Sequence, residues 1–230
     1  MDELADVTLR DRAVFVDGIL VVSDLHLGQA ERSNVDFPVG DGSEVIERLE
    51  TLCECFEPTV VVIAGDLLHS FRTVPRTVRR TVDDLHEGVE ESGAELVVLR
   101  GNHDTMLDSV WDGEIADSYR IDGTLVCHGH VEPETDAKRY IVGHDHPAIT
   151  IEGRKRPCYL AGERVYRNAD LLMLPAFSRL VAGARINDMG TDDFLSPLVT
   201  DADALRPIVL DEDTDETLAF PPLGEFRHRL

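Results

Sequence analysis

The sequence is poor in lysine: Lys138 and Lys155 are the only two among 22 basic residues, whereas aspartate and glutamate number 45. The formal net charge at pH 7 is therefore −23. Such a surface repels polyanions at long range, which disfavours nonspecific coating of nucleic acid unless salt screens the charge or local basic patches override it. The arginine-based, strongly acidic composition is typical of halophilic proteins, and an ordinary acidic bacterial protein is the alternative.

Long apolar runs are also missing. The longest stretches, such as 60–64, fall far short of the roughly 20 residues that a membrane-spanning helix needs. The acidic opening 1–12 has no signal-peptide core, and the four cysteines show no secreted disulfide pattern. We therefore expect a cytoplasmic protein that has no membrane-embedded part and that keeps its thiols reduced.

The order of apolar segments predicts an α/β fold. A hairpin over 13–23, a helix capped by Ser43 and a strand at 59–65 are followed by a helix from Pro75 and a strand at 95–101. Near-continuous Val, Ile and Leu in strands that alternate with helices indicate a buried, largely parallel sheet.

Shorter strand patterns between 124 and 175 predict a second sheet. With 230 residues the chain fits one domain and a short appendage. We expect the domain to cover 1–200, and the acidic C-terminal segment 201–230 to pack on it or trail from it.

Polar residues gather where the apolar strands end. The segments concerned are 24–28, 65–69, 101–104, 128–130 and 143–147, and they hold seven of the nine histidines. Open α/β sheets bind ligands at the carboxyl ends of their strands, so we expect the functional site there.

These clusters combine aspartate, histidine and asparagine. Each buried polar group without a partner would cost ~2–7 kcal/mol, and a bound cation removes that cost. Oxygen and imidazole donors without a cysteine pair suit manganese, iron or zinc. The sequence therefore predicts a divalent metal site.

In chain order the segments read D-x-H, G-D, G-N-H-D, H-G-H and G-H-x-H, between Asp24 and His146. This pattern resembles that of the calcineurin-like metallophosphoesterases. The resemblance implies a four-layer αββα sandwich in which two mixed sheets are flanked by helices. It also implies two metal ions, most favourably Mn²⁺, with iron or zinc as alternatives. The implied metal ligands are Asp24, His26, Asp66, Asn102, His128, His144 and His146.

Within that resemblance Asp66 bridges the two ions, and His128 is preferred to His130 as a ligand. His103 is the implied catalytic histidine that assists the leaving group, and Asp104 orients it. Two cations roughly 3.5–4 Å apart lower the pKa of a bridging water, so the expected nucleophile is hydroxide.

The second and third motifs bear on the substrate. Protein phosphatases of the family carry an arginine shortly after G-D and end the third motif in glutamate, whereas this chain has GDLLHS and GNHD. The chain is more similar to compact archaeal phosphoesterases related to double-strand-break-repair nucleases and to DNA-ligase-associated phosphoesterases. This implies a phosphodiesterase or nuclease that acts on nucleotides or nucleic acid, single-stranded nucleic acid included.

Other interpretations stay open. The chain could be a phosphomonoesterase acting on small molecules, or a noncatalytic metal-binding scaffold. A helicase or repair protein as partner is implied by resemblance alone, and a homodimer is not excluded. Two basic stretches, Arg72 to Arg80 and Arg154 to Arg156, could steer phosphate, although solvated salt pairs and a solubilising tip are the stronger interpretations.

The net charge generates a prediction about salt. Raising monovalent salt from dilute buffer to 1 M shortens the Debye length to roughly 3 Å, which relieves self-repulsion of the fold and repulsion of an anionic substrate. Thermal stability and diesterase rate should therefore rise together across the titration. A steady fall of both quantities would contradict the halophilic interpretation.

Overall fold

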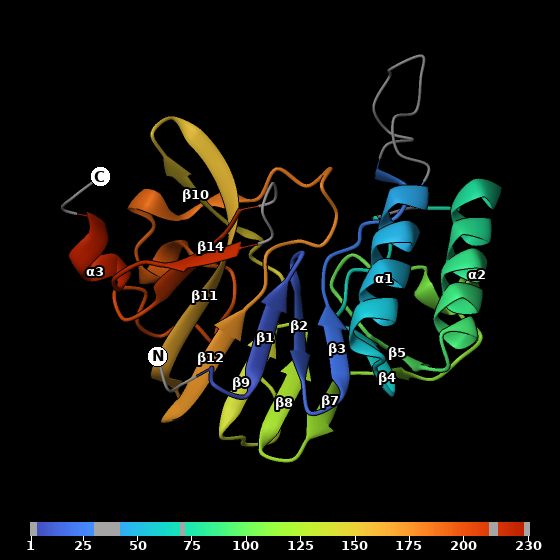
Figure 1. The fold of residues 1–230 in the computed structure, drawn as a ribbon, viewed down its shortest axis with the longest axis horizontal. Coiled ribbons are helices and arrows are strands. Elements are labelled where there is room, and N and C mark those ends of the chain that lie inside the picture. The colour runs from blue at the N-terminus through green and yellow to red at the C-terminus, as the bar shows by residue number, and fades with distance from the viewer. Residues whose placement is uncertain (1–3, 30–41, 70–71, 212–215, 228–230) are drawn as a thin grey trace.

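The computed structural model describes residues 4–29, 42–69, 72–211 and 216–227 (Figure 1). Its first sheet has the strand order β1-β2-β3-β4-β5-β6. The strands are β1 (Val7–Arg10), β2 (Ala13–Val16), β3 (Ile19–Val22), β4 (Val60–Ile63), β5 (Glu95–Leu99) and β6 (Ile115–Ala116). β3 to β6 run parallel, and β1 and β2 extend the sheet as antiparallel strands.

Helices α1 (Ser43–Phe56) and α2 (Arg76–Glu91) cover one face of this sheet (Figure 1). Each turns a stripe of buried apolar side chains inward, such as Leu49 and Leu52 in α1 or Val82 and Leu85 in α2. The predicted start of α2 is confirmed. The prediction that Ser43 caps α1 is wrong by one residue, because Gly42 takes the cap position with a φ of 91°.

In the described part of the chain the second sheet has nine strands of mixed direction, with the path β13-β10-β11-β12-β9-β8-β7; β14 pairs with β11, and β15 pairs with β14. The strands are β7 (Ser118–Ile121), β8 (Thr124–Cys127), β9 (Arg139–Val142), β10 (Pro147–Ile151), β11 (Arg154–Tyr166), β12 (Ala169–Met173), β13 (Ala184–Arg185), β14 (Arg206–Asp211) and β15 (Glu216–Ala219).

The acidic C-terminal stretch contributes to this sheet. β14 pairs antiparallel with β11, with Cys158 opposite Val209, and residues 207–210 are buried. The short helix α3 (Leu223–Phe226) follows β15 and buries Leu223. The described part of 201–230 thus packs on the fold, and a domain boundary at residue 200 stays a prediction.

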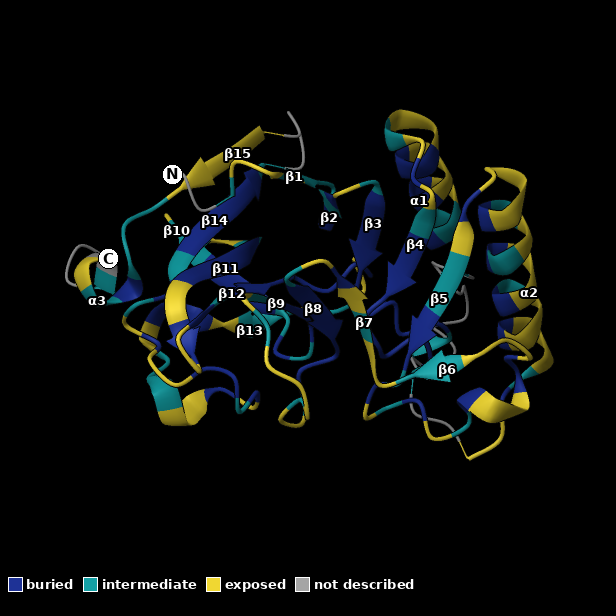
Figure 2. Ribbon diagram, turned by 90° about the horizontal axis from the view of Figure 1, so that it is seen from below, coloured by how far each residue is buried: buried dark blue, intermediate teal, exposed yellow. Residues whose placement is uncertain are grey.

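Three apolar cores separate four layers. Leu20 and Ile63 pack against α1 and α2, whereas Val21 and Val62, one residue along, face the second sheet. Figure 2 shows the buried strands of both sheets lying between the helices and the outer segments. The hydroxyl of Tyr159 in β11 donates to the carbonyl oxygen of Ala13 in β2 at 2.9 Å and so links the sheets directly.

The fourth layer, outside the second sheet, is built from loops and short 3₁₀ helices, η3 (Ile186–Asp188) and η4 (Thr191–Asp193), within the described ranges. Their Ile186 and neighbouring Phe194 and Leu198 pack against β9, β11 and β12. The predicted α/β sandwich of two mixed sheets is confirmed, with this irregular segment as its outer cover.

Neither α1, α2 nor any other helix in the described part of the chain has the length and apolar character that membrane crossing requires.

The topology brings the polar motifs together. β3, β4 and β5 are parallel, with Val22 opposite Ile63 and Ile63 opposite Val98, so the first three motifs leave the sheet at one edge. β8 and β9 are also parallel, with Cys127 opposite Val142, and deliver the last two motifs from the second sheet.

Candidate metal centre

Five of the predicted ligands have an unusual backbone conformation. Their φ angles are 59° at Asp24, 46° at His26, 50° at Asp66, 74° at His144 and 49° at His146. Positive φ is uncommon outside glycine, although aspartate and histidine adopt it several times more often than most residues. The sharp turns after the strands bring side chains that are close in sequence into one cluster, at a cost in backbone strain that such sites commonly carry.

Two motif glycines leave room for the carboxylates. A Cβ atom at Gly101 would lie 2.1 Å from Oδ1 of Asp66. One at Gly143 would lie 1.7 Å from Oγ of Ser23 and 2.5 Å from Oδ2 of Asp24. The loops can therefore approach the two aspartates this closely only because these positions carry no side chain.

The first predicted ligand set forms a compact group. Asp24, His26, Asp66 and His146 each offer one donor atom, and these atoms all lie within 4.8 Å of one another. Nε2 of His146 is 2.9 Å from Oδ1 of Asp24 and 3.4 Å from Nε2 of His26. Nε2 of His26 is 3.8 Å from Oδ2 of Asp66.

The second predicted set lies on the other side of Asp66. Nε2 of His128 is 3.5 Å from Oδ2 of Asp66 and 2.9 Å from Oδ1 of Asn102. The ring of His144 lies 5.0 Å from that of His128. Oδ2 of Asp66 thus lies near a ring nitrogen from each predicted set, at 3.8 Å from His26 and 3.5 Å from His128.

His128 and His130 differ in how they meet the centre. Nδ1 of the buried His128 lies 3.0 Å from the carbonyl oxygen of Ala64, which can only accept, so Nδ1 donates there and Nε2 is the ring nitrogen turned toward Asp66 and Asn102. His130 lies behind it, with its ring 5.2 Å from that of His128.

The two carboxylates are buried and charged. Asp24 is 0% exposed and Asp66 is 1% exposed. Burial alone would raise the pKa of both groups, but the imidazoles of His146 and His128 outweigh it and hold both pKa values below their ordinary range. The hydroxyl of Ser23 adds a hydrogen bond of 2.6 Å to Oδ2 of Asp24.

The imidazoles divide into two pairs. Burial lowers the pKa of His26 and of His144 to about 4, which keeps both rings neutral at pH 7. Burial also opposes the charge on His128 and His146, but the nearby carboxylates outweigh it, raising the pKa of His128 to about 9 and that of His146 above its usual value.

These observations fit a metal centre. Nε2 of His26 and Nε2 of His146 face each other at 3.4 Å beside the buried Oδ1 of Asp24, a gathering of ligand atoms that a coordinated cation would stabilise. The donors are carboxylate oxygens and imidazole nitrogens, the set that borderline divalent ions prefer.

His103 lies beside this centre. Its backbone N–H donates to Oδ1 of Asp66 at 2.8 Å, and its ring meets that of His26 edge-on at 5.2 Å. Within the described residues, Nδ1 of His103 has no hydrogen-bond partner. Both Asp104 oxygens instead accept backbone N–H groups, from Leu68 and Gly101, each at 2.9 Å. Asp104 therefore joins the loop that carries His103 to the loop of the second motif.

The match to a known family agrees with this geometry. Residues 18–146, more than half of the chain, match the model of the calcineurin-like phosphoesterase family. The chain belongs to that family. This phosphoesterase is accordingly a metal-dependent phosphoric ester hydrolase.

A solved structure shares its fold. Over 93% of this chain and 94% of the other, the phosphoesterase is similar to the nuclease MPE of Pseudomonas putida, with a TM-score of 0.64 and 21% sequence identity. A second similar structure is YfcE, a phosphoesterase from E. coli, with a TM-score of 0.44, 16% identity and coverage of 89% and 98%. No curated protein matches the sequence.

Sequence analysis missed several residues that hold the centre of the phosphoesterase in place. The buried carboxylate of Asp145 accepts the N–H groups of Leu195 and Ser196, at 2.7 and 3.0 Å, and so ties the last motif to the outer layer. Its position between two motif histidines was the available signal. Ser23, directly before the first motif, was similarly visible as a strand-end hydroxyl.

Two buried arginines, also missed, brace the first ligand. Arg12 donates to the carbonyl oxygens of Ala176 and Ser178 at 3.1 and 3.0 Å, and Arg48 donates to that of Phe177 at 2.7 Å. The backbone N–H groups of residues 177 and 178 in turn bind the carbonyl oxygens of residues 23 and 24. Nothing in the local sequence pattern indicated these long-range contacts.

His69, at the end of the second motif segment, and the arginines of α2 have different surroundings. His69 lies at the cluster, with its ring 5.8 Å from that of His26. The expected pair of Arg80 with Asp84 is present at 3.7 Å on exposed α2, whereas Arg79 donates to the carbonyl oxygen of Ser109. Arg80 is thus engaged in the salt pair that its spacing indicated.

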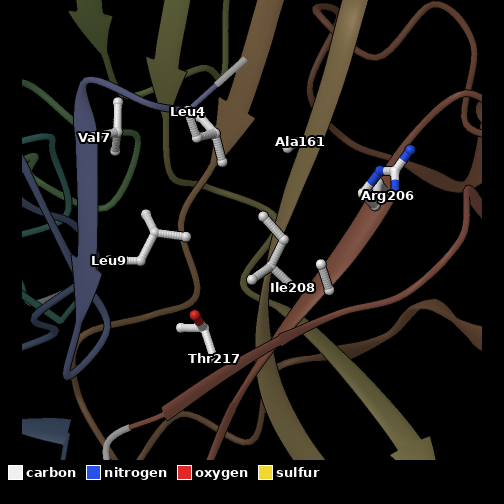
Figure 3. Close-up of a pocket in the computed structure, with 8 residues that line it drawn as sticks. Leu4, Val7, Leu9, Ala161, Arg206, Ile208 and Thr217 are labelled. Atoms are coloured by element: carbon white, nitrogen blue, oxygen red, sulfur yellow. The ribbon is translucent and has the colours of Figure 1, made fainter. Parts of the chain in front are cut away.

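An apolar cavity of about 270 Å³ lies elsewhere, between β1 and the strands β14 and β15 (Figure 3). Its lining is mostly aliphatic, including Leu4, Leu9 and Ile208, and Arg206 is its only charged residue. With no carboxylate or imidazole in its wall, this cavity lacks the groups that phosphoryl transfer requires.

The bridging position of Asp66 generates a prediction. The purified protein should bind up to two divalent ions per chain, and Asp66→Ala should lower the occupancy of both positions. His146→Ala, which removes a ligand from the first set alone, should lower the stoichiometry by one ion. Elemental analysis after dialysis measures both variants. Full occupancy in Asp66→Ala would contradict the bridging role.

Proposed function

We propose that this phosphoesterase hydrolyses phosphodiesters, with nucleic acid or nucleotides as substrates. The observation that carries the proposal is the presence of open space on both sides of the ligand cluster. A cavity of about 500 Å³ includes His128 and His130 in its lining, and one of about 200 Å³ includes His146. A phosphate held between them has room for a substituent on each side, which a diester needs and a monoester does not.

The proposed cofactors are two divalent ions. Asp24, His26, Asp66 and His146 would hold one, and Asp66 together with Asn102, His128 and His144 would hold the other. Mn²⁺ suits the mixture of oxygen and nitrogen donors, with iron and zinc as alternatives for the test. When bound, such ions polarise the phosphoryl oxygens and activate water.

His103 is the proposed catalytic residue of this chain. Its imidazole lies beside the ligand cluster, 5.2 Å from the ring of His26 and 6.2 Å from that of His69. In that position it donates a proton to the departing oxygen, which otherwise leaves as a high-energy alkoxide. Asp104 is a positioning residue, because its carboxylate holds the backbone of Gly101, two residues before His103, and that of Leu68 in the loop of the second motif.

The proposal is tested with the manganese-loaded protein on three substrates: bis(p-nitrophenyl) phosphate, p-nitrophenyl phosphate and a single-stranded oligonucleotide. We expect hydrolysis of the aryl diester and the oligonucleotide, and loss of both activities after chelation. Faster hydrolysis of the monoester would establish a phosphomonoesterase instead. Stoichiometric metal with no turnover of any substrate would favour the noncatalytic scaffold.

A variant separates binding from chemistry. His103→Ala should keep its metal content yet lose roughly 10²–10⁴-fold in kcat, the usual cost of removing a general acid. The control is His86→Ala, since His86 is a half-exposed histidine on α2 that pairs with Glu90 at 3.5 Å. Turnover by His103→Ala at the rate of this control would remove His103 from the mechanism.

A further inference from the structure

The two cavities beside the metal centre carry opposite charge. The lining of the smaller one, next to His146, contains the three cations Arg12, Lys155 and Arg179 and no carboxylate. The larger one, next to His128, is lined by Asp117, Glu132 and Glu134, and Arg100 is the one arginine or lysine in its lining. Arg100 is in turn paired with Asp108 at 2.9 Å. In a chain of net charge −23, three cations at one cavity are a marked local exception.

Lys155 reaches the smaller cavity from a hairpin. β10 and β11 form this hairpin, which projects from the second sheet (Figure 1), and Lys155 lies near its turn. Strand side chains alternate between faces, so Arg154 and Arg156 point to a different cavity, beside Asp211. Lys155 therefore lines the cavity beside His146, whereas Arg154 and Arg156 line the other cavity.

The ammonium group of Lys155 is held in place and retains donors. Nζ donates to the carbonyl oxygen of Gly183 at 2.6 Å, which uses one of its three protons. Among the residues that the structure describes, no carboxylate pairs with Lys155. Ala184, next to Gly183, donates to the carbonyl oxygen of His146 at 2.8 Å, so the same loop ties Lys155 to a metal ligand.

The other two cations form the wall. Arg12 is 7% exposed, and its guanidinium donates to the carbonyl oxygens of Ala176 and Ser178. Arg179 lies 3.5 Å from Asp11 and 3.3 Å from Glu44. Their positions are thus fixed by the fold, and Lys155 is the cation whose head group is available to a ligand.

The size of the cavity limits which ligands can fit in it. About 200 Å³ lies below the roughly 300–1,000 Å³ typical of pockets for drug-sized molecules, so the space suits a phosphate group better than a nucleobase. Building on the proposed function, we infer that this cavity binds the phosphate next to the scissile one in a nucleic acid strand, with Lys155 as the contact residue. The strand then extends past His146, because the carboxylates of the opposite cavity repel further phosphates.

The test compares Lys155→Gln with Arg154→Gln, which removes the same charge from the same hairpin but from the face turned away. The substrates are a single-stranded oligothymidylate and bis(p-nitrophenyl) phosphate, which has no second phosphate. Lys155→Gln should lower the ratio of kcat/KM for the oligonucleotide to that for the aryl diester roughly tenfold, mainly through KM. Arg154→Gln should keep the parent ratio, and Lys155→Arg should largely restore it.

Salt dependence supplies a readout that a structural defect would not change. Losing one phosphate contact on a single strand should shift the slope of log(1/KM) against log salt by about 0.7 relative to the parent. An unchanged ratio in Lys155→Gln, or an equal fall in Arg154→Gln, overturns the subsite. Failure of the parent enzyme to cleave either diester overturns the proposed function itself, so the two outcomes are distinct.

Discussion

The structure depends on holding two carboxylates, Asp24 and Asp66, side by side where solvent does not reach them. Two like charges at this depth would repel each other and would lose their hydration. Surrounding groups stabilise the two carboxylates. Imidazoles lie beside both, the hydroxyl of Ser23 donates to Asp24, and the backbone N–H of His103 donates to Asp66. A cation site is the natural outcome, because positive charge is what the two carboxylates lack.

The backbone around the carboxylates is strained, and the rest of the fold holds it. Each left-handed non-glycine residue costs on the order of 1–3 kcal/mol when the conformation is unfavourable, and five ligands share it. Three buried cores and the direct link from Tyr159 to Ala13 keep the two sheets in register. Buried Arg12 and Arg48 add rigid supports behind Asp24. The ligands are therefore preorganised by packing that lies outside the cluster.

Charge is distributed on two scales. The whole chain is acidic, which keeps polyanions away at long range, whereas three cations line one small cavity beside His146. At distances shorter than a Debye length the local cations decide the interaction. The cations beside His146 thus stand against an acidic surface, and the carboxylates of the cavity beside His128 give the two flanks of the ligand cluster different charge.

The sequence by itself determined the main strands and helices of the first sheet and the residue types that offer ligand atoms. Strand ends marked by D-x-H, G-D, G-N-H-D and G-H-x-H predicted which side chains gather, because parallel strands deliver their carboxyl ends to one edge. The pattern could not reveal contacts between distant segments. Asp104 engages the backbone of Leu68 in place of the ring of His103, Arg12 reaches the carbonyl groups of 176 and 178, and β14 adds a buried strand from an acidic stretch. The division of the basic tip, with Lys155 facing the centre and Arg154 turned away, also required the structure. Only the tertiary structure decided these points, because local propensity acts over a few neighbouring residues, whereas hydrogen bonds and charge pairs depend on where chain folding places each side chain.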